Sequence, residues 1–133
     1  MHTQAMLGAH PHVAGRTDAA LIRCIEECFS CAQACTSCAD ACLGEDMVAD
    51  LARCIRLDMD CADICLAAGK VASRRTEPSD AILMSVLDAC ATICRLCAEE
   101  CDMHARIHEH CRICAEACRA CEEACEALLA SVR

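Results

Sequence analysis

Cysteine recurs along this chain at alternating steps of three and four residues, which is the spacing of one face of an α-helix. The pattern is carried by 18 cysteines in 133 residues. They are Cys24, Cys28, Cys31, Cys35, Cys38, Cys42, Cys54, Cys61, Cys65, Cys90, Cys94, Cys97, Cys101, Cys111, Cys114, Cys118, Cys121 and Cys125. In a helical bundle such positions form the core and are normally occupied by leucine and isoleucine. The spacing therefore predicts a bundle whose core is lined with thiols.

The segments between the cysteine runs contain signals that end and start helices, and they divide the chain into four long helices. Gly44 follows the first cysteine run, and Pro78 falls in the first turn of the third helix. Short connections make neighbouring helices antiparallel, so we expect an all-α, up-down-up-down four-helix bundle over residues 18–133. Residues 1–17 form an N-terminal extension, as a loop or a short helix. The expected helices cover about residues 18–43, 46–72, 79–103 and 107–131.

The composition is typical of a core made of sulfur in a reducing compartment. The chain has no Trp, no Tyr and one Phe, so aromatic side chains cannot fill the interior. Its N-terminal residues show no secretory signal, and no apolar run approaches the roughly 20 residues that span a bilayer. We therefore expect a cytoplasmic protein whose cysteines bind metal rather than form disulfides. The net charge of −9 argues against nucleic acid or an anionic membrane as partners.

The antiparallel arrangement predicts which cysteines meet. If residue 43 lies beside residue 107, the first and fourth helices pair Cys24 with Cys125, Cys28 with Cys121, Cys31 with Cys118, Cys35 with Cys114, and Cys38 with Cys111. If residue 43 lies beside residue 46, the first and second helices pair Cys24 with Cys65, Cys28 with Cys61, and Cys35 with Cys54. Asp58 occupies the position of a fourth cysteine on the second helix. It is either an oxygen ligand or proton acceptor in the core, or a solvated side chain on a slightly rotated helix.

Thiolate is a soft ligand that selects Cu(I), zinc or iron–sulfur clusters. Recurrent C-x-x-x-C pairs on regular helices favour Cu(I), which accepts two or three sulfurs, over the four-ligand geometry of structural zinc. Buried thiols are neutral without metal, so each Cu⁺ that replaces one proton keeps the core neutral. The predicted function is storage of multiple Cu(I) ions, on the order of one per cysteine, which limits free copper in the cytosol.

Two other functions remain open, a thiol/disulfide redox protein and a scavenger of zinc or cadmium. Cysteines four residues apart on a helix can meet the Cα separation of a disulfide, so geometry alone does not exclude the redox function. Zinc would need two thiolates for each ion to stay neutral, which would halve the capacity. No catalytic base beside a reactive cysteine is visible in the sequence, so we do not expect an enzyme.

The two ends of the predicted bundle differ in chemistry. One end extends the cysteine positions into Met47, Asp50, His104 and His108, with Met103 and His110 close by. The other end extends them into Leu21, Leu83, Leu87, Leu128 and Val132. Imidazole and thioether groups can bind Cu(I), so the candidate ligands at the uptake end are Met47, His104, His108 and His110. The alternative is that these histidines cap helix ends and that Met47 fills a gap.

These features resemble the copper storage proteins, a family of cysteine-rich four-helix bundles. The C-x-x-x-C pairs on the four helices and the histidine and methionine end carry the resemblance, which covers about residues 18–131. It implies that Cys thiolates hold Cu(I) and that copper is taken up at the polar end. The lack of a signal is similar to the cytosolic branch, whose members are often tetramers, so the resemblance implies a homo-oligomer with copper ions as partners. Asp58 departs from the pattern and leaves the ligands around it open.

Overall fold

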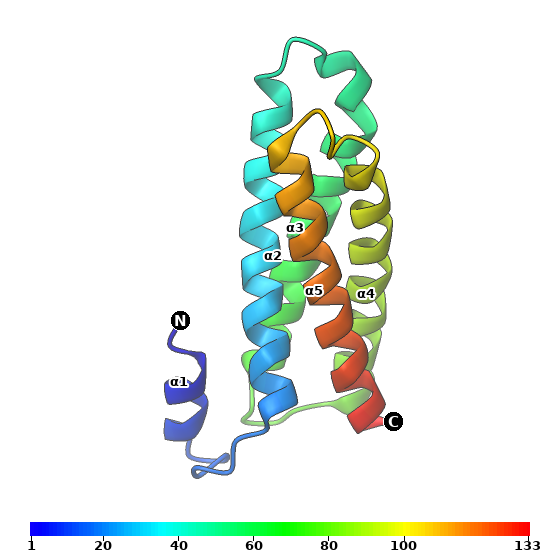
Figure 1. Cartoon of the computed structure of the whole chain (residues 1–133). Coiled ribbons are helices and arrows are strands. Elements are labelled where there is room, and N and C mark those ends of the chain that lie inside the picture. Colours follow the sequence, from blue (N-terminus) through cyan, green and yellow to red (C-terminus); the bar gives the residue numbers. More distant parts are fainter.

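The computed structural model describes all residues from Met1 to Arg133 and contains helices but no strand. This confirms the all-α fold. A short helix lies in the N-terminal extension, and four long helices follow, the second of them preceded by a short 3₁₀ helix (Figure 1). The elements are α1 (Thr3–Ala9), α2 (Ala19–Leu43), η1 (Val48–Leu51), α3 (Ala52–Ser73), α4 (Asp80–Asp102) and α5 (Glu109–Val132).

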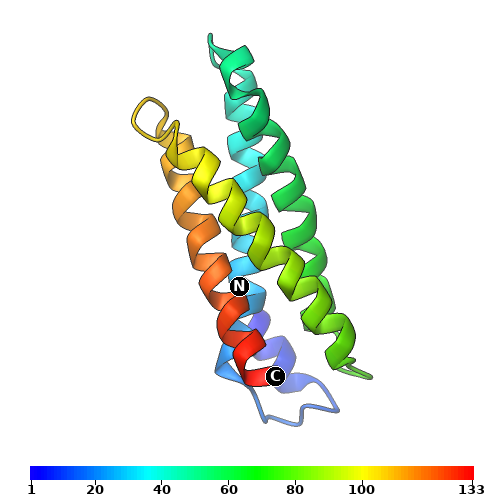
Figure 2. The ribbon, with the colours of Figure 1, turned by 90° about the vertical axis from the view of Figure 1, so that its right-hand side faces the viewer.

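The four long helices run alternately up and down and enclose one core (Figure 1). Helix α2 packs against α3 and α5, and α4 packs against the same two helices. Figure 2 shows the bundle from the side, with the α2–α3 and α4–α5 connections at one end and the α3–α4 connection at the other. Helix α1 packs against α2, beside the end that carries the α3–α4 connection. The packing therefore buries one face of every long helix.

The starts of two long helices follow from their capping residues. The Asp18 carboxylate accepts a hydrogen bond from the Ala20 backbone N–H at 2.9 Å and begins α2. The Ser79 hydroxyl accepts one from the Ile82 N–H at 3.3 Å and begins α4. Each bond satisfies a backbone donor that has no partner inside the helix.

The second long helix begins at Ala52, whereas the sequence predicted a start near residue 46. Gly44 ends α2, and the chain then forms a turn and the short helix η1 before α3 starts. Leu51, the last residue of η1, is 1% exposed and anchors this connection to the end of the bundle. The connection therefore places α3 further along the bundle than a direct turn would.

The core consists of sulfur along most of its length and of leucine at one end. All the cysteines belong to a single buried cluster, together with alanines that let the helices approach closely. At the end that carries the α3–α4 connection, hydrocarbon replaces sulfur, as predicted. We call this end the leucine end, and its buried residues are Leu21, Leu83, Leu87 and Leu128.

Helix α4 is long and apolar enough to cross a membrane by length and composition, with a mean hydropathy of 1.8 over its most apolar window. The sequence analysis expected no apolar run long enough to span a bilayer. The hydropathy of α4 is higher than that expectation, because cysteine and alanine contribute to it. Its cysteines and two of its leucines are buried in the bundle. Packing against α3 and α5 therefore accounts for the apolar face of this helix.

Candidate metal centre

The thiol column, by which we mean the 18 cysteine side chains, runs through the core from one end of the bundle towards the other. Every cysteine is buried and free, and none is more than 1% exposed. Sulfur atoms from different helices lie in contact, with the shortest separation, 3.5 Å, between Cys65 and Cys94. The column is therefore dry and continuous, with no disulfide in it.

The contacts between α2 and α5 follow the predicted register. The two helices are regular and antiparallel, so every predicted pair is in contact at the sulfur atoms. The Sγ–Sγ distances are 3.8 Å for Cys24–Cys125, 3.8 Å for Cys28–Cys121, 3.7 Å for Cys31–Cys118, 3.6 Å for Cys35–Cys114 and 3.9 Å for Cys38–Cys111.

The contacts of α3 do not follow the predicted register. The sulfur of Cys61 lies 3.9 Å from Cys31, not beside Cys28. Cys65 contacts Cys90 and Cys94 of α4 at 3.6 and 3.5 Å, and its sulfur makes no contact with that of Cys24. Cys54 likewise groups with Cys38, Cys42 and Cys111, not with Cys35. The predicted pairs between α2 and α3 are wrong by about one helical turn, because η1 and the turn before it separate the two helices.

The thiols form overlapping groups of four whose sulfur atoms lie within 4.8 Å of one another. One group is Cys31, Cys35, Cys61 and Cys118, which joins three helices. Cys31 belongs to a second group with Cys65, Cys94 and Cys121. A sulfur that belongs to two groups can bridge two ions, so the column can hold a series of soft cations without a break.

Asp58 lies inside the thiol column, so the alternative that it is solvated is wrong. Its side chain is 0% exposed. Its Oδ1 accepts from the thiols of Cys97 at 3.1 Å, Cys114 at 3.2 Å and Cys101 at 3.6 Å. Burial, followed by the negative charge that the neighbouring Cys114 and Cys97 would carry as thiolates, raises the pKa of Asp58 from 3.8 to about 11. The carboxyl group is therefore protonated and neutral near pH 7.

Burial also favours neutral thiols at the end of the column that faces the α2–α3 connection. It raises the pKa of Cys42 to about 11, with the possible charge on Cys54 as the second cause. The pKa of Cys111 is raised for the same two reasons. A metal ion that binds these two thiols must therefore displace their protons.

We call the end that carries the α2–α3 and α4–α5 connections the histidine end. His110 is the imidazole that touches the column, with Nδ1 3.4 Å from Cys38 Sγ and 3.6 Å from Cys111 Sγ. Its Nε2 is buried and has no hydrogen-bond partner. The sequence placed His110 only near the cysteine positions, because it lies one residue away from Cys111.

The other predicted histidines are held by carboxylates that the sequence analysis did not single out. The His104 Nε2–H donates to Glu100 at 2.8 Å, and Arg53 Nε donates to the other oxygen of Glu100 at 3.1 Å. The Nδ1 of His108 lies against the Glu45 carboxylate. The spacing of four residues between Glu100 and His104 is a signal that could have revealed the first pair. The second pair joins distant segments and has no local signal.

The two methionines predicted or placed at this end lie at the surface. Met47 precedes η1 and is 46% exposed. Met103 follows α4 and is 73% exposed. Asp50 is also exposed. Of the polar side chains at the histidine end, the imidazole of His110 therefore approaches the sulfur atoms most directly.

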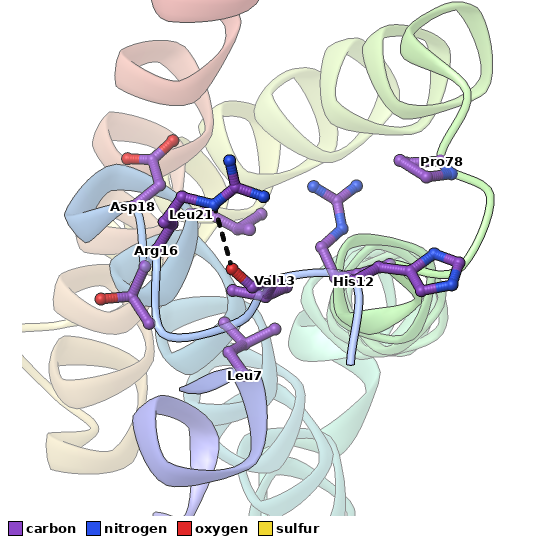
Figure 3. Close-up of a pocket in the computed structure, with 9 residues that line it drawn as sticks. Leu7, His12, Val13, Arg16, Asp18, Leu21 and Pro78 are labelled. Carbon is purple, nitrogen blue, oxygen red and sulfur yellow. Dashed lines mark hydrogen bonds between the residues drawn. The ribbon is translucent and has the colours of Figure 1, made fainter. Parts of the chain in front are cut away.

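A pocket at the leucine end is separate from the thiol column (Figure 3). It lies between the N-terminal extension and the α3–α4 connection, where Arg16 Nε donates to the Val13 carbonyl at 3.4 Å. Its lining includes His12, Leu21 and Pro78 but no cysteine. This pocket therefore offers no soft ligand for copper.

Comparison with known proteins agrees with this geometry. A family model for copper storage proteins matches residues 17–130. The structure of Ccsp from Streptomyces lividans loaded with 10 copper equivalents is 56% identical with a TM-score of 0.92, and the match covers 96% of this chain and 98% of that chain. A cytosolic copper storage protein from Streptomyces lividans with five coppers is 62% identical with a TM-score of 0.82, over 84% and 92% of the two chains. No curated protein matches the chain. The chain belongs to the copper storage protein family.

Proposed function

We propose that this protein stores Cu(I) in the thiol column and so limits free copper in the cytosol. The observation that carries the proposal is that all 18 cysteines are buried, free and in contact along one core. A chaperone that passes on one ion needs few ligands, whereas this number of thiols provides capacity. The cytosolic Streptomyces relative supports the location.

Charge balance sets the capacity. Each Cu⁺ binds a thiolate and releases one proton, so the core stays neutral at every stage of filling. Sulfurs that belong to two groups of four, such as Cys31, can bridge two ions. We therefore expect a capacity on the order of one ion per thiol, about 18 in all. The structures of relatives with 10 and five coppers are consistent with progressive filling of such a core.

His110 is the residue through which copper reaches the column. Its Nδ1 lies within 3.6 Å of the sulfurs of Cys38 and Cys111, so it can take the proton that an arriving ion displaces. His104, His108 and Met47 are further candidate ligands for Cu(I) at the histidine end. Asp58, which is protonated in the empty column, serves as an oxygen ligand once an arriving ion displaces its proton, and four cysteines surround it there.

The remaining parts of the proposal concern assembly and partners. We expect a homo-oligomer, a tetramer by its resemblance to the cytosolic branch, with copper ions as the only ligands that the column needs. We expect no enzymatic activity. We also expect no binding to nucleic acid or to an anionic membrane, because the chain carries a net charge of −9.

Titration of the reduced apo-protein with Cu(I), without oxygen and against a competing chelator, tests the function. We expect saturation far above four equivalents, with about one proton released per ion. Saturation at one to four equivalents would contradict storage. Two or more protons per ion and a stronger response to zinc or cadmium would favour a scavenger, and loss of free thiols after isolation in air would favour a redox protein.

A further inference from the structure

A contact between a histidine and a carboxylate joins the two connections at the histidine end. Glu45 lies in the connection between α2 and η1, and His108 is the residue that precedes α5. These segments are far apart in the sequence and stand at the same end of the bundle (Figure 2). The Nδ1 of His108 lies against a carboxylate oxygen of Glu45. The pair therefore holds one connection against the other.

His108 covers the histidine that touches the thiol column. The rings of His108 and His110 are stacked, with centroids 5.5 Å apart and planes inclined by 21°. His108 is only 7% exposed, although it lies at the end of a helix. Its side chain makes no capping bond to α5, so the contact with the Glu45 carboxylate is what holds its ring in place.

Glu100, the other carboxylate that holds a histidine at this end, does not lie beside the histidine that covers His110. Glu100 pairs with His104 one turn away on the same helix, and Arg53 of α3 also binds it. This pair joins α3 to α4, but its histidine makes no ring contact with His110. Only the Glu45 pair therefore holds the imidazole that lies over His110.

We propose that Glu45 is a positioning residue that fastens His108 over His110 and thereby slows copper uptake. This proposal rests on the proposed function, because it assumes that Cu(I) reaches the column past His110. An ion passes when the pair between Glu45 and His108 opens, so the uptake rate follows the fraction of molecules in which it is open. Weakening the pair raises that fraction without removing a thiol.

Glu45 also has a second effect, which would speed copper uptake and not slow it. A surface carboxylate attracts cations, so its removal for that reason alone would slow the arrival of Cu⁺. The neighbouring Asp46 carries the same charge and is exposed, but it forms no ion pair. The variant Asp46→Asn is therefore a matched control for the change in net charge.

The test compares Glu45→Gln with Asp46→Asn in stopped-flow loading of the reduced apo-protein by a Cu(I)–chelator complex. We expect Glu45→Gln to load about tenfold faster, because the carboxylate that holds His108 in place is lost, while its final capacity is unchanged. Asp46→Asn should load at the parent rate or slightly more slowly. Loading of Glu45→Gln at the parent rate or below would overturn the proposal.

A second pair of variants shows whether Glu45 acts through His108. On a His108→Ala background, adding Glu45→Gln should leave the loading rate unchanged, because no imidazole remains to be held. An equal acceleration on both backgrounds would overturn the role of His108. The capacity measured at the end point, together with the helical circular dichroism signal, shows that each variant is folded. Failure of the storage function itself would instead appear as a low capacity in the parent protein.

Discussion

Asp58 is the one carboxyl group inside the thiol column, and replacing it by asparagine should change how stability depends on pH. In the folded protein burial raises the pKa of this group from 3.8 to about 11. The folded state therefore keeps a proton that the unfolded chain releases above about pH 4. The contribution of Asp58 to the unfolding free energy is then fully present below pH 3.8, and it is lost progressively as pH rises towards the folded pKa of about 11.

The magnitude follows from the slope of about 1.4 kcal/mol per pH unit for one proton. Between about pH 5 and about pH 7, the unfolding free energy of the wild-type protein should fall by about 3 kcal/mol through Asp58 alone. Asp58→Asn lacks this contribution, so the difference in unfolding free energy between the two proteins should change by that amount. The other ionisable groups are common to both proteins, so their contributions cancel in the difference.

Urea unfolding of the reduced, metal-free proteins, followed by far-ultraviolet circular dichroism, measures this difference at each pH. Asp63→Asn is the matched control, because Asp63 is exposed on the same helix. That control should retain the wild-type slope. If the difference between wild type and Asp58→Asn stayed constant across this range, Asp58 would not be neutral in the folded state and the reasoning would be wrong.

Two further substitutions separate the roles of sulfur and hydrocarbon in the core. Cys118→Ser removes a sulfur that contacts Cys31, Cys35 and Cys61 at 3.6 to 3.9 Å, so Cu(I) capacity in the anaerobic titration should fall by at least about one ion. An unchanged end point would show that Cys118 holds no copper. Leu87→Ala empties a position that is 0% exposed at the leucine end, so the unfolding free energy should fall by about 2–5 kcal/mol in urea. Copper capacity should stay at the parent value, and a loss would mean that this end also takes part in binding.

The face that each helix buries was predictable from the sequence. A residue's position around a helix depends on its spacing from neighbours within one or two turns, so the steps between Cys111 and Cys125 place those sulfurs on one side. The contacts between α2 and α5 were predictable for the same reason, because both helices are regular over the whole contact. The leucine end was also predictable, because its leucines continue the spacing of the cysteines.

The position of α3 along the bundle was not predictable. It depends on the path of residues 44–51, where a turn and a 3₁₀ helix replace the expected start of an α-helix. Burial of Leu51 against the rest of the bundle stabilises that path, and this contact is made by residues distant in the sequence. One turn of displacement was enough to exchange Cys28 for Cys31 as the partner of Cys61.

The sequence by itself determined that sulfur lines the core and how many thiols it holds, because helical periodicity and composition are local properties. Only the tertiary structure decided which sulfurs meet those of α3, that Asp58 lies among them as a neutral acid, and that His110 touches the column while His108 covers it. These features depend on the offset between helices and on the connections that set it. Contacts between residues far apart in the chain stabilise those connections, and no local spacing encodes them.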